Sequence, residues 1–228
     1  MRGQKEAIRK QFYAQLEILI AEYDYTPFKT HSTTDYTFMK KAQPDVDWYL
    51  HSHLSHAQPP YTVFTVAACR YIAATKRLNA FLDKHQITSV SHPAVGFGEW
   101  VDKHAQIEKV ANLSADKKLV NVTADNIEEA ARQACERIMA AESACLLPRV
   151  EQSKVVEEYL TKRPHQWPTS DLFNCCAIIV SYGLLTDDPV LIKRGIERTF
   201  EILNKPNYSQ RNREFFEAVR DAVHKEFG

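Results

Sequence analysis

Residues 46–54 are the segment that most constrains the fold of this chain. Apolar and polar side chains alternate there with a period of two, as expected for a β-strand with one apolar and one polar face. The apolar set is Val46, Trp48, Leu50 and Leu54, and the polar set is Asp47, Tyr49, His51 and His53. We therefore predict that Trp48 and Leu50 are buried and that His51 and His53 lie on the opposite face of the strand.

Further strands are expected on both sides of this segment. Aromatic and β-branched residues separated by turn residues predict strands near 27–31, 35–41 and 61–72. Residues 61–73 also fit a helical stripe, so both interpretations stay open there, and we place a strand to about 72 and a helix over 75–85. Two apolar runs within 87–122 predict two weak strands.

Apolar positions spaced three and four residues apart predict helices at both ends of the chain. The first covers about 3–23, with Ile8, Phe12, Leu16, Leu19, Ile20 and Tyr23 on its core stripe. After residue 123, helices are predicted from about Asp125 to Cys145, kinked or ended by Pro148, and then over 150–160, 172–185, 189–203 and 208–227. Asp125 and Asp188 are the predicted N-caps of two of them.

These elements predict the α+β class, with an N-terminal helix and an antiparallel β-meander packed against a C-terminal set of α-helices. We expect residues 1–122 to hold the helix and sheet and residues 123–228 to be a helical half packed on that sheet, in one compact unit. The element order resembles that of small bacterial domains, some of them immunity proteins encoded beside toxin genes. The resemblance implies a protein-binding role and rests on no motif, so it assigns no family.

Composition and charge narrow the functional classes. The 228 residues are 44% apolar and 25% charged, as in soluble globular proteins. The 29 basic and 29 acidic residues cancel, so no overall field attracts the chain to nucleic acid. The longest uncharged apolar run, 172–186, is shorter than the ~20 residues needed to cross a bilayer. We expect a cytoplasmic protein with no nucleic-acid or membrane partner, and the sequence gives no oligomeric state.

The five cysteines are predicted to be reduced core residues, because most lie in apolar stretches and their number is odd. Cys175 and Cys176 are adjacent in such a stretch, without the basic neighbour that activates a nucleophilic thiol. The Gly96 to Gly98 segment lacks the further residues of a phosphate-binding loop. Trp167, between two prolines, is expected to cover the core. No cofactor is predicted.

The histidines of the 46–54 segment are the sharpest candidate site. On one strand face, His51 and His53 could share a metal ion if a third ligand came from elsewhere in the chain. Alternatively, Tyr49, His51 and His53 form a solvated or partner-facing surface. Because no complete catalytic constellation is present, we predict a non-catalytic protein-interaction module. The alternative is a metal-dependent hydrolase-like enzyme that uses the His51/His53 cluster, and the sequence leaves enzyme activity open.

Overall fold

The structure is a computed structural model that describes residues 2–28, 36–55, 58–87, 108–112, 120–163, 172–203 and 210–228. The described elements follow the predicted order of an N-terminal helix, an antiparallel sheet and several C-terminal helices, which confirms the α+β class. By their internal contacts the residues form two compact units. The first comprises Met1–Cys69 and Lys109–Val150, and the second comprises Arg70–Glu108 and Glu151–Gly228. The division expected at residue 122 stays a prediction.

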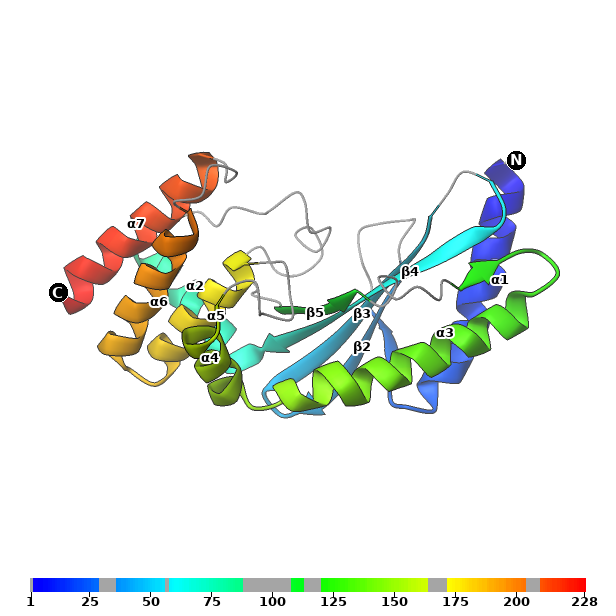
Figure 1. Cartoon of the computed structure of the whole chain (residues 1–228), viewed down its shortest axis with the longest axis horizontal. Helices are drawn as coiled ribbons and strands as arrows, with labels where there is room; N and C mark the ends of the chain where they lie inside the picture. The colour runs from blue at the N-terminus through cyan, green and yellow to red at the C-terminus, as the bar shows by residue number, and fades with distance from the viewer. Residues whose placement is uncertain are drawn as a thin grey trace. The chain divides into compact units, whose positions relative to one another are not determined.

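The first unit combines helices α1 and α3 with a sheet of six strands (Figure 1). Its elements are α1 (Arg2–Ala21), β1 (Thr26–Phe28), β2 (Tyr36–Gln43), β3 (Val46–Ser55), β4 (Tyr61–Tyr71), β5 (Glu108–Asn112), β6 (Asn121–Val122) and α3 (Ile127–Ala141). A π-helical segment (Glu142–Leu146) and a 3₁₀ turn (Leu147–Arg149) follow α3. Pro148 lies in that turn, so the helix ends as the proline predicts.

The sheet has the strand order β1-β2-β3-β4-β5, and β6 pairs with β4. Strands β1, β2 and β3 form an antiparallel meander in which Phe38 lies opposite Leu50 and Thr37 lies opposite His51. Pro27 lies on the edge strand β1, where a residue without an N–H is tolerated. Residues 61–71 are a strand, and helix α2 begins directly after it at Ile72.

One face of the sheet is covered by helix α1. Tyr13 of α1 is fully buried, its hydroxyl lies 3.2 Å from Ser52 Oγ, and its ring stacks on Tyr36. Trp48 and Leu50 belong to the same strand face as Ser52, since residues two apart point the same way. Both are buried, as predicted. Helix α3 packs against α1 in this layer.

Helix α1 ends two residues earlier than its apolar stripe predicts. It stops at Ala21, and Asp24 then adopts a left-handed conformation with φ of 66°. This turn leaves Tyr23 exposed and directs Tyr25 into the core. The assignment of Tyr23 to the core stripe is therefore wrong, because periodicity does not show where a helix stops.

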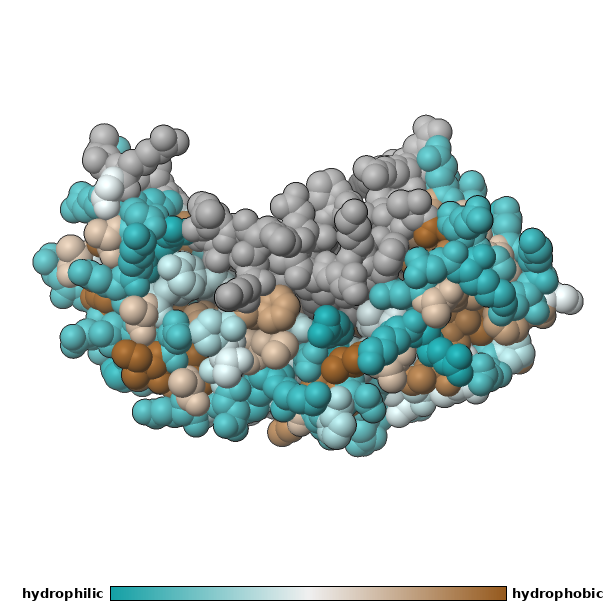
Figure 2. All heavy atoms as spheres, turned by 180° about the vertical axis from the view of Figure 1, so that it is seen from behind, coloured by the Kyte–Doolittle hydropathy of each residue, from teal (hydrophilic) through white to brown (hydrophobic). Residues whose placement is uncertain are grey.

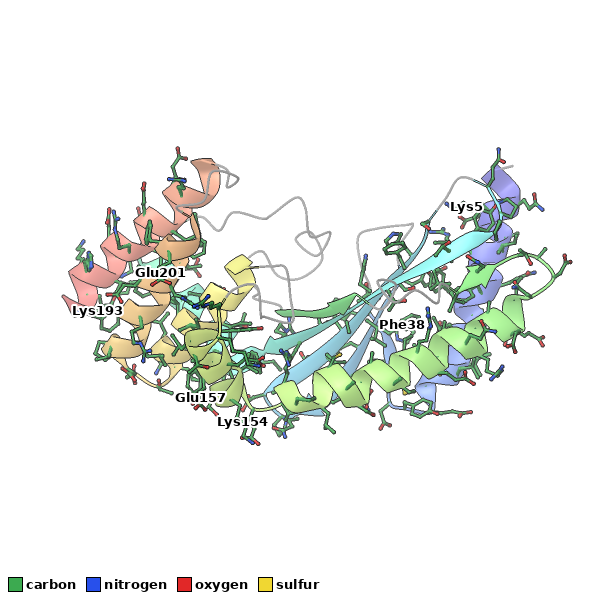
Figure 3. The ribbon with its side chains drawn as sticks, in the orientation of Figure 1. Lys5, Phe38, Lys154, Glu157, Lys193 and Glu201 are labelled. Atoms are coloured by element: carbon green, nitrogen blue, oxygen red, sulfur yellow. The ribbon has the colours of Figure 1, made fainter. Side chains whose placement is uncertain are left out.

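The described residues of the second unit form an array of five helices. They are α2 (Ile72–Lys84), α4 (Gln152–Thr161), α5 (Leu172–Leu185), α6 (Pro189–Leu203) and α7 (Gln210–Phe227). The apolar α5 packs against α2, α4 and α6 around a core that includes Leu82, Val180 and Ile192. Asp188 Oδ1 accepts hydrogen bonds from the N–H groups of Val190 and Leu191, which confirms the predicted cap of α6. Figure 3 labels Lys154 and Glu157 on α4 and Lys193 and Glu201 on α6.

Three further predictions can be compared with the described residues. Cys69 and Cys135 are buried free thiols and Cys145 is a half-buried one, whereas the Cys175 and Cys176 side chains lie outside the described part. The N-cap of α3 is Asn126 and not Asp125, because the helix begins at Ile127. None of the described helices is long and apolar enough to span a membrane. Residues 96–98 and Trp167 are not among the described residues.

Candidate functional site

The polar face of β3 is closed to solvent along most of its length. Tyr49 is fully buried and His51 retains only 7% of its exposed surface, while His53 is half-buried. His51 Nδ1 lies 3.1 Å from the Thr37 hydroxyl, and the Tyr49 ring meets Phe28 edge-on. The expectation of a solvated face is therefore wrong for Tyr49 and His51. The alternation places these residues on the second face correctly, but a pattern within one strand does not show whether that face is covered.

The two histidines are neighbours without a third ligand among the described residues. The ring centroids of His51 and His53 are 6.3 Å apart, and the His53 ring stacks on Phe64. In the part of the chain that the structure describes, no group of three or more His, Cys, Asp or Glu side chains could hold a metal ion. The metal interpretation thus has two candidate ligands among the described residues and stays a prediction.

A polar groove lies between α1 and the N-terminal end of α3, with a volume of about 820 Å³. We call it the α1–α3 groove. It is lined by Gln11, Ala14 and Gln15 of α1, by residues 124–129, and by Arg132. The α1 residues recur at helical spacing, so they form one stripe, and Ile18 continues that stripe one turn further along. Ile18 is 62% exposed, which is high for a large apolar side chain.

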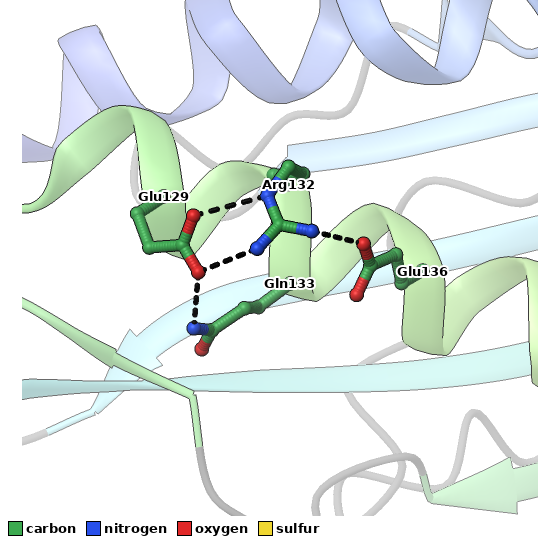
Figure 4. A network of polar contacts seen from close by, with 4 residues as sticks. All are labelled: Glu129, Arg132, Gln133 and Glu136. Atoms are coloured by element: carbon green, nitrogen blue, oxygen red, sulfur yellow. Dashed lines mark hydrogen bonds and ion pairs between the residues drawn. The ribbon is translucent and has the colours of Figure 1, made fainter.

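The described lining residues of this groove carry three carboxylates and one guanidinium. Arg132 binds Glu129 through two nitrogens and also binds Glu136, while Gln133 donates to Glu129 (Figure 4). These hydrogen bonds, chiefly the one from Arg132, lower the pKa of Glu129. Asp125 and Glu128 are exposed and form no ion pair with the described residues. The groove therefore has excess negative charge.

Cys135 lies on α3 beyond the groove and is buried. Burial raises the pKa of the Cys135 thiol, and the nearby carboxylates of Glu22 and Glu136 raise it further. A thiol in such surroundings stays protonated and is a poor nucleophile. The Cys135 thiol is therefore not a candidate nucleophile.

A second polar cluster centres on Lys40 of β2. Lys40 Nζ lies 2.8 Å from Glu142 Oε1 and 5.5 Å from the centroids of both the Tyr25 and Trp48 rings. Tyr25 and Trp48 are almost fully buried, whereas the Lys40 and Glu142 side chains keep 18% and 19% of their exposed surface. Burial and the neighbouring Glu142 carboxylate raise the pKa of Tyr25 far above its usual value, so its hydroxyl stays protonated.

Sequence reasoning did not find either of these features. Lys40 lies two residues after Phe38 and four after Tyr36, so it shares their inward face of β2. A lysine on such a face indicates that an acidic or aromatic partner lies nearby, and this signal was available in the sequence. No comparable signal exists for the groove, because it forms only when α1 and α3 meet. On the side shown in Figure 2, hydrophilic side chains cover most of the described surface and hydrophobic ones form separate patches. That side offers a partner mainly polar contacts.

Comparisons with known proteins add no further constraint on the site. No protein-family model, no curated protein and no solved structure matched this chain.

Proposed function

We propose that this protein is a non-catalytic protein-binding module that docks a basic segment of its partner in the α1–α3 groove. The observation that carries the proposal is the pair of exposed carboxylates, Asp125 and Glu128, in the groove. Among the described lining residues the one guanidinium, that of Arg132, is engaged by Glu129 and Glu136. Exposed carboxylates without an ion-pair partner attract a positively charged partner and fix its orientation.

The size of the α1–α3 groove and the apolar side chain beside it also support the docking of a protein segment. A volume of about 820 Å³ lies within the range of ligand-binding clefts in proteins, so the groove has room for side chains of a partner segment. Ile18, exposed at the end of the α1 stripe, supplies an apolar contact next to the polar groove. Interfaces commonly combine an apolar anchor with a polar surround. A segment with lysine or arginine beside an apolar residue matches this arrangement.

Binding of a partner through Tyr49, His51 and His53 stays a prediction, and the contacts of these side chains count against it. Tyr49 is fully buried and the His51 ring already has a hydrogen-bonding partner in Thr37. A partner would have to displace both side chains from their present contacts, at the cost of opening a packed face of the sheet. The α1–α3 groove requires no such rearrangement.

Selection from a random peptide display library tests the proposal. Peptides are enriched on the wild-type protein and then measured on the variant Asp125→Lys/Glu128→Lys. The matched control is Glu157→Lys/Glu197→Lys, which makes the same charge change on exposed residues of α4 and α6. We expect enriched peptides to be basic, to bind the control variant like the wild type, and to bind the groove variant at least about tenfold more weakly. Enrichment of peptides without excess Lys or Arg, or equal loss on both variants, would contradict the proposal.

A further inference from the structure

We propose that Tyr25, Trp48 and Glu142 form a cation-binding cage, which Lys40 fills from within the chain and which takes a small alkylated ammonium ligand when Lys40 leaves. The ligand class is a quaternary ammonium that carries a hydrogen-bond acceptor, as glycine betaine does. The three cage residues come from the turn after α1, from β3 and from the π-helical segment, all within the first unit.

The composition of the cage favours a cation. Two aromatic rings lie at the same 5.5 Å from the Lys40 ammonium, within the distance at which a ring face attracts a positive charge. The Glu142 carboxylate neutralises the charge at 2.8 Å. Aromatic walls with one carboxylate are the general chemistry by which proteins bind alkylated ammonium groups.

Unsatisfied polar atoms indicate that Lys40 is an imperfect occupant. The Tyr25 hydroxyl, Trp48 Nε1 and Glu142 Oε2 are buried, and none of them has a partner with hydrogen-bond geometry among the described residues. The Glu142 carboxylate is the nearby acceptor for Tyr25 and raises the pKa of its hydroxyl, whereas no such acceptor is identified for Trp48 Nε1. Both groups can donate a hydrogen bond, but an ammonium has no acceptor to offer them. A ligand with a carboxylate beside its ammonium would occupy the cage and also accept from Tyr25 and Trp48.

Local irregularities provide a route for opening the cage. The β2–β3 register shifts between Lys41 and Gln43, directly after Lys40. Glu142 begins the π-helical segment. Bulges and π-helical turns occur frequently next to binding sites, where they re-aim a side chain. The cage meets solvent at the Lys40–Glu142 pair, whose side chains keep 18% and 19% of their exposed surface, and an outward movement of Lys40 would open it there.

Isothermal titration calorimetry with glycine betaine and with tetramethylammonium tests this inference on the full chain. Lys40→Ala frees the cage, Lys40→Ala/Glu142→Gln removes its charge, and Lys41→Ala is the matched control, since it removes an exposed lysine from the opposite strand face. We expect Lys40→Ala to bind betaine about 10–100-fold more tightly than the wild type and Lys41→Ala do, because Lys40 competes for the site. Betaine should bind Lys40→Ala about tenfold more tightly than tetramethylammonium.

Two results would overturn the inference. One is a folded Lys40→Ala protein that binds betaine no more tightly than the Glu142→Gln double variant, and the other is equal affinity for betaine and tetramethylammonium. If Lys40→Ala does not fold, the wild type decides the matter. We then expect the wild type to bind betaine weakly but saturably and the Glu142→Gln variant not to bind it. Betaine binding that the Glu142→Gln variant retains, or a wild type without saturable binding, refutes the cage.

Discussion

Gly183→Ala should destabilise the second unit although alanine is the better helix former. An alanine Cβ at this position of α5 would lie 2.7 Å from Ile192 Cγ1 and 2.9 Å from the Ile192 backbone nitrogen. That nitrogen is fixed, because Ile192 N–H donates to Asp188 O while Asp188 N–H donates to Gly183 O. Both distances are shorter than an ordinary contact, so the overpacking should cost about 2–3 kcal/mol, the upper part of the usual range, whereas replacing a helical glycine returns about 1 kcal/mol. We expect a net loss of about 1–2 kcal/mol.

Two further glycines provide graded controls for this substitution. A Cβ at Gly195 of α6 would meet only side-chain atoms, at 2.9 Å from Ile179 and 3.0 Å from Val180, so Gly195→Ala should cost less than Gly183→Ala. A Cβ at Gly3 of α1 would meet nothing within 4 Å, so Gly3→Ala should be neutral or stabilising. Urea denaturation followed by far-UV circular dichroism measures all three. A Gly183→Ala protein as stable as the wild type would refute the reasoning about close packing of α5 and α6.

Three other predictions can be tested by similar means. Trp48→Ala should lower the free energy of unfolding by about 3–5 kcal/mol and His53→Ala by less than about 1, and a reversed order in denaturation would show that the β3 register is wrong. A fragment of residues 1–122 lacks α3, which packs on α1, so it should be insoluble or molten, and a soluble cooperative fragment would favour independent domains. The pKa of Glu226 is held below its usual 4.5 by Lys84 and, to a smaller extent, by His85. The stabilisation from these contacts is complete above that pH and is lost as the pH falls through the lowered pKa. Glu226→Gln should therefore destabilise the protein at pH 7 and progressively less in acid, which unfolding curves at several pH values would show.

The sequence predicted the elements well where the signal is local. The alternation of residues 46–54 located β3 and the faces of Trp48 and His51, and Asp188 located the start of α6. These patterns depend on the fixed periods of strand and helix and on capping within one turn, so the neighbouring residues alone determine them.

The candidate sites could not be predicted in the same way, because they depend on contacts between distant segments. The burial of Tyr49 and His51 depends on what covers the second face of the sheet. The contact of Lys40 with Glu142 joins residues from β2 and from the segment after α3. Gln11 and Asp125 line one groove only because α1 and α3 pack together. Periodicity within an element indicates which face turns inward, but it does not identify the element that faces it.

Hydrogen–deuterium exchange tests the docking of a basic segment in the α1–α3 groove most directly. The exchange of the full chain is compared with and without the basic peptide that the display selection enriches most. The account predicts slower exchange in residues 11–18 of α1 and 124–132 at the start of α3, and no change in the Asp125→Lys/Glu128→Lys variant. Protection confined to residues 46–55 of β3, or protection of α1 and α3 that persists in that variant, would contradict it.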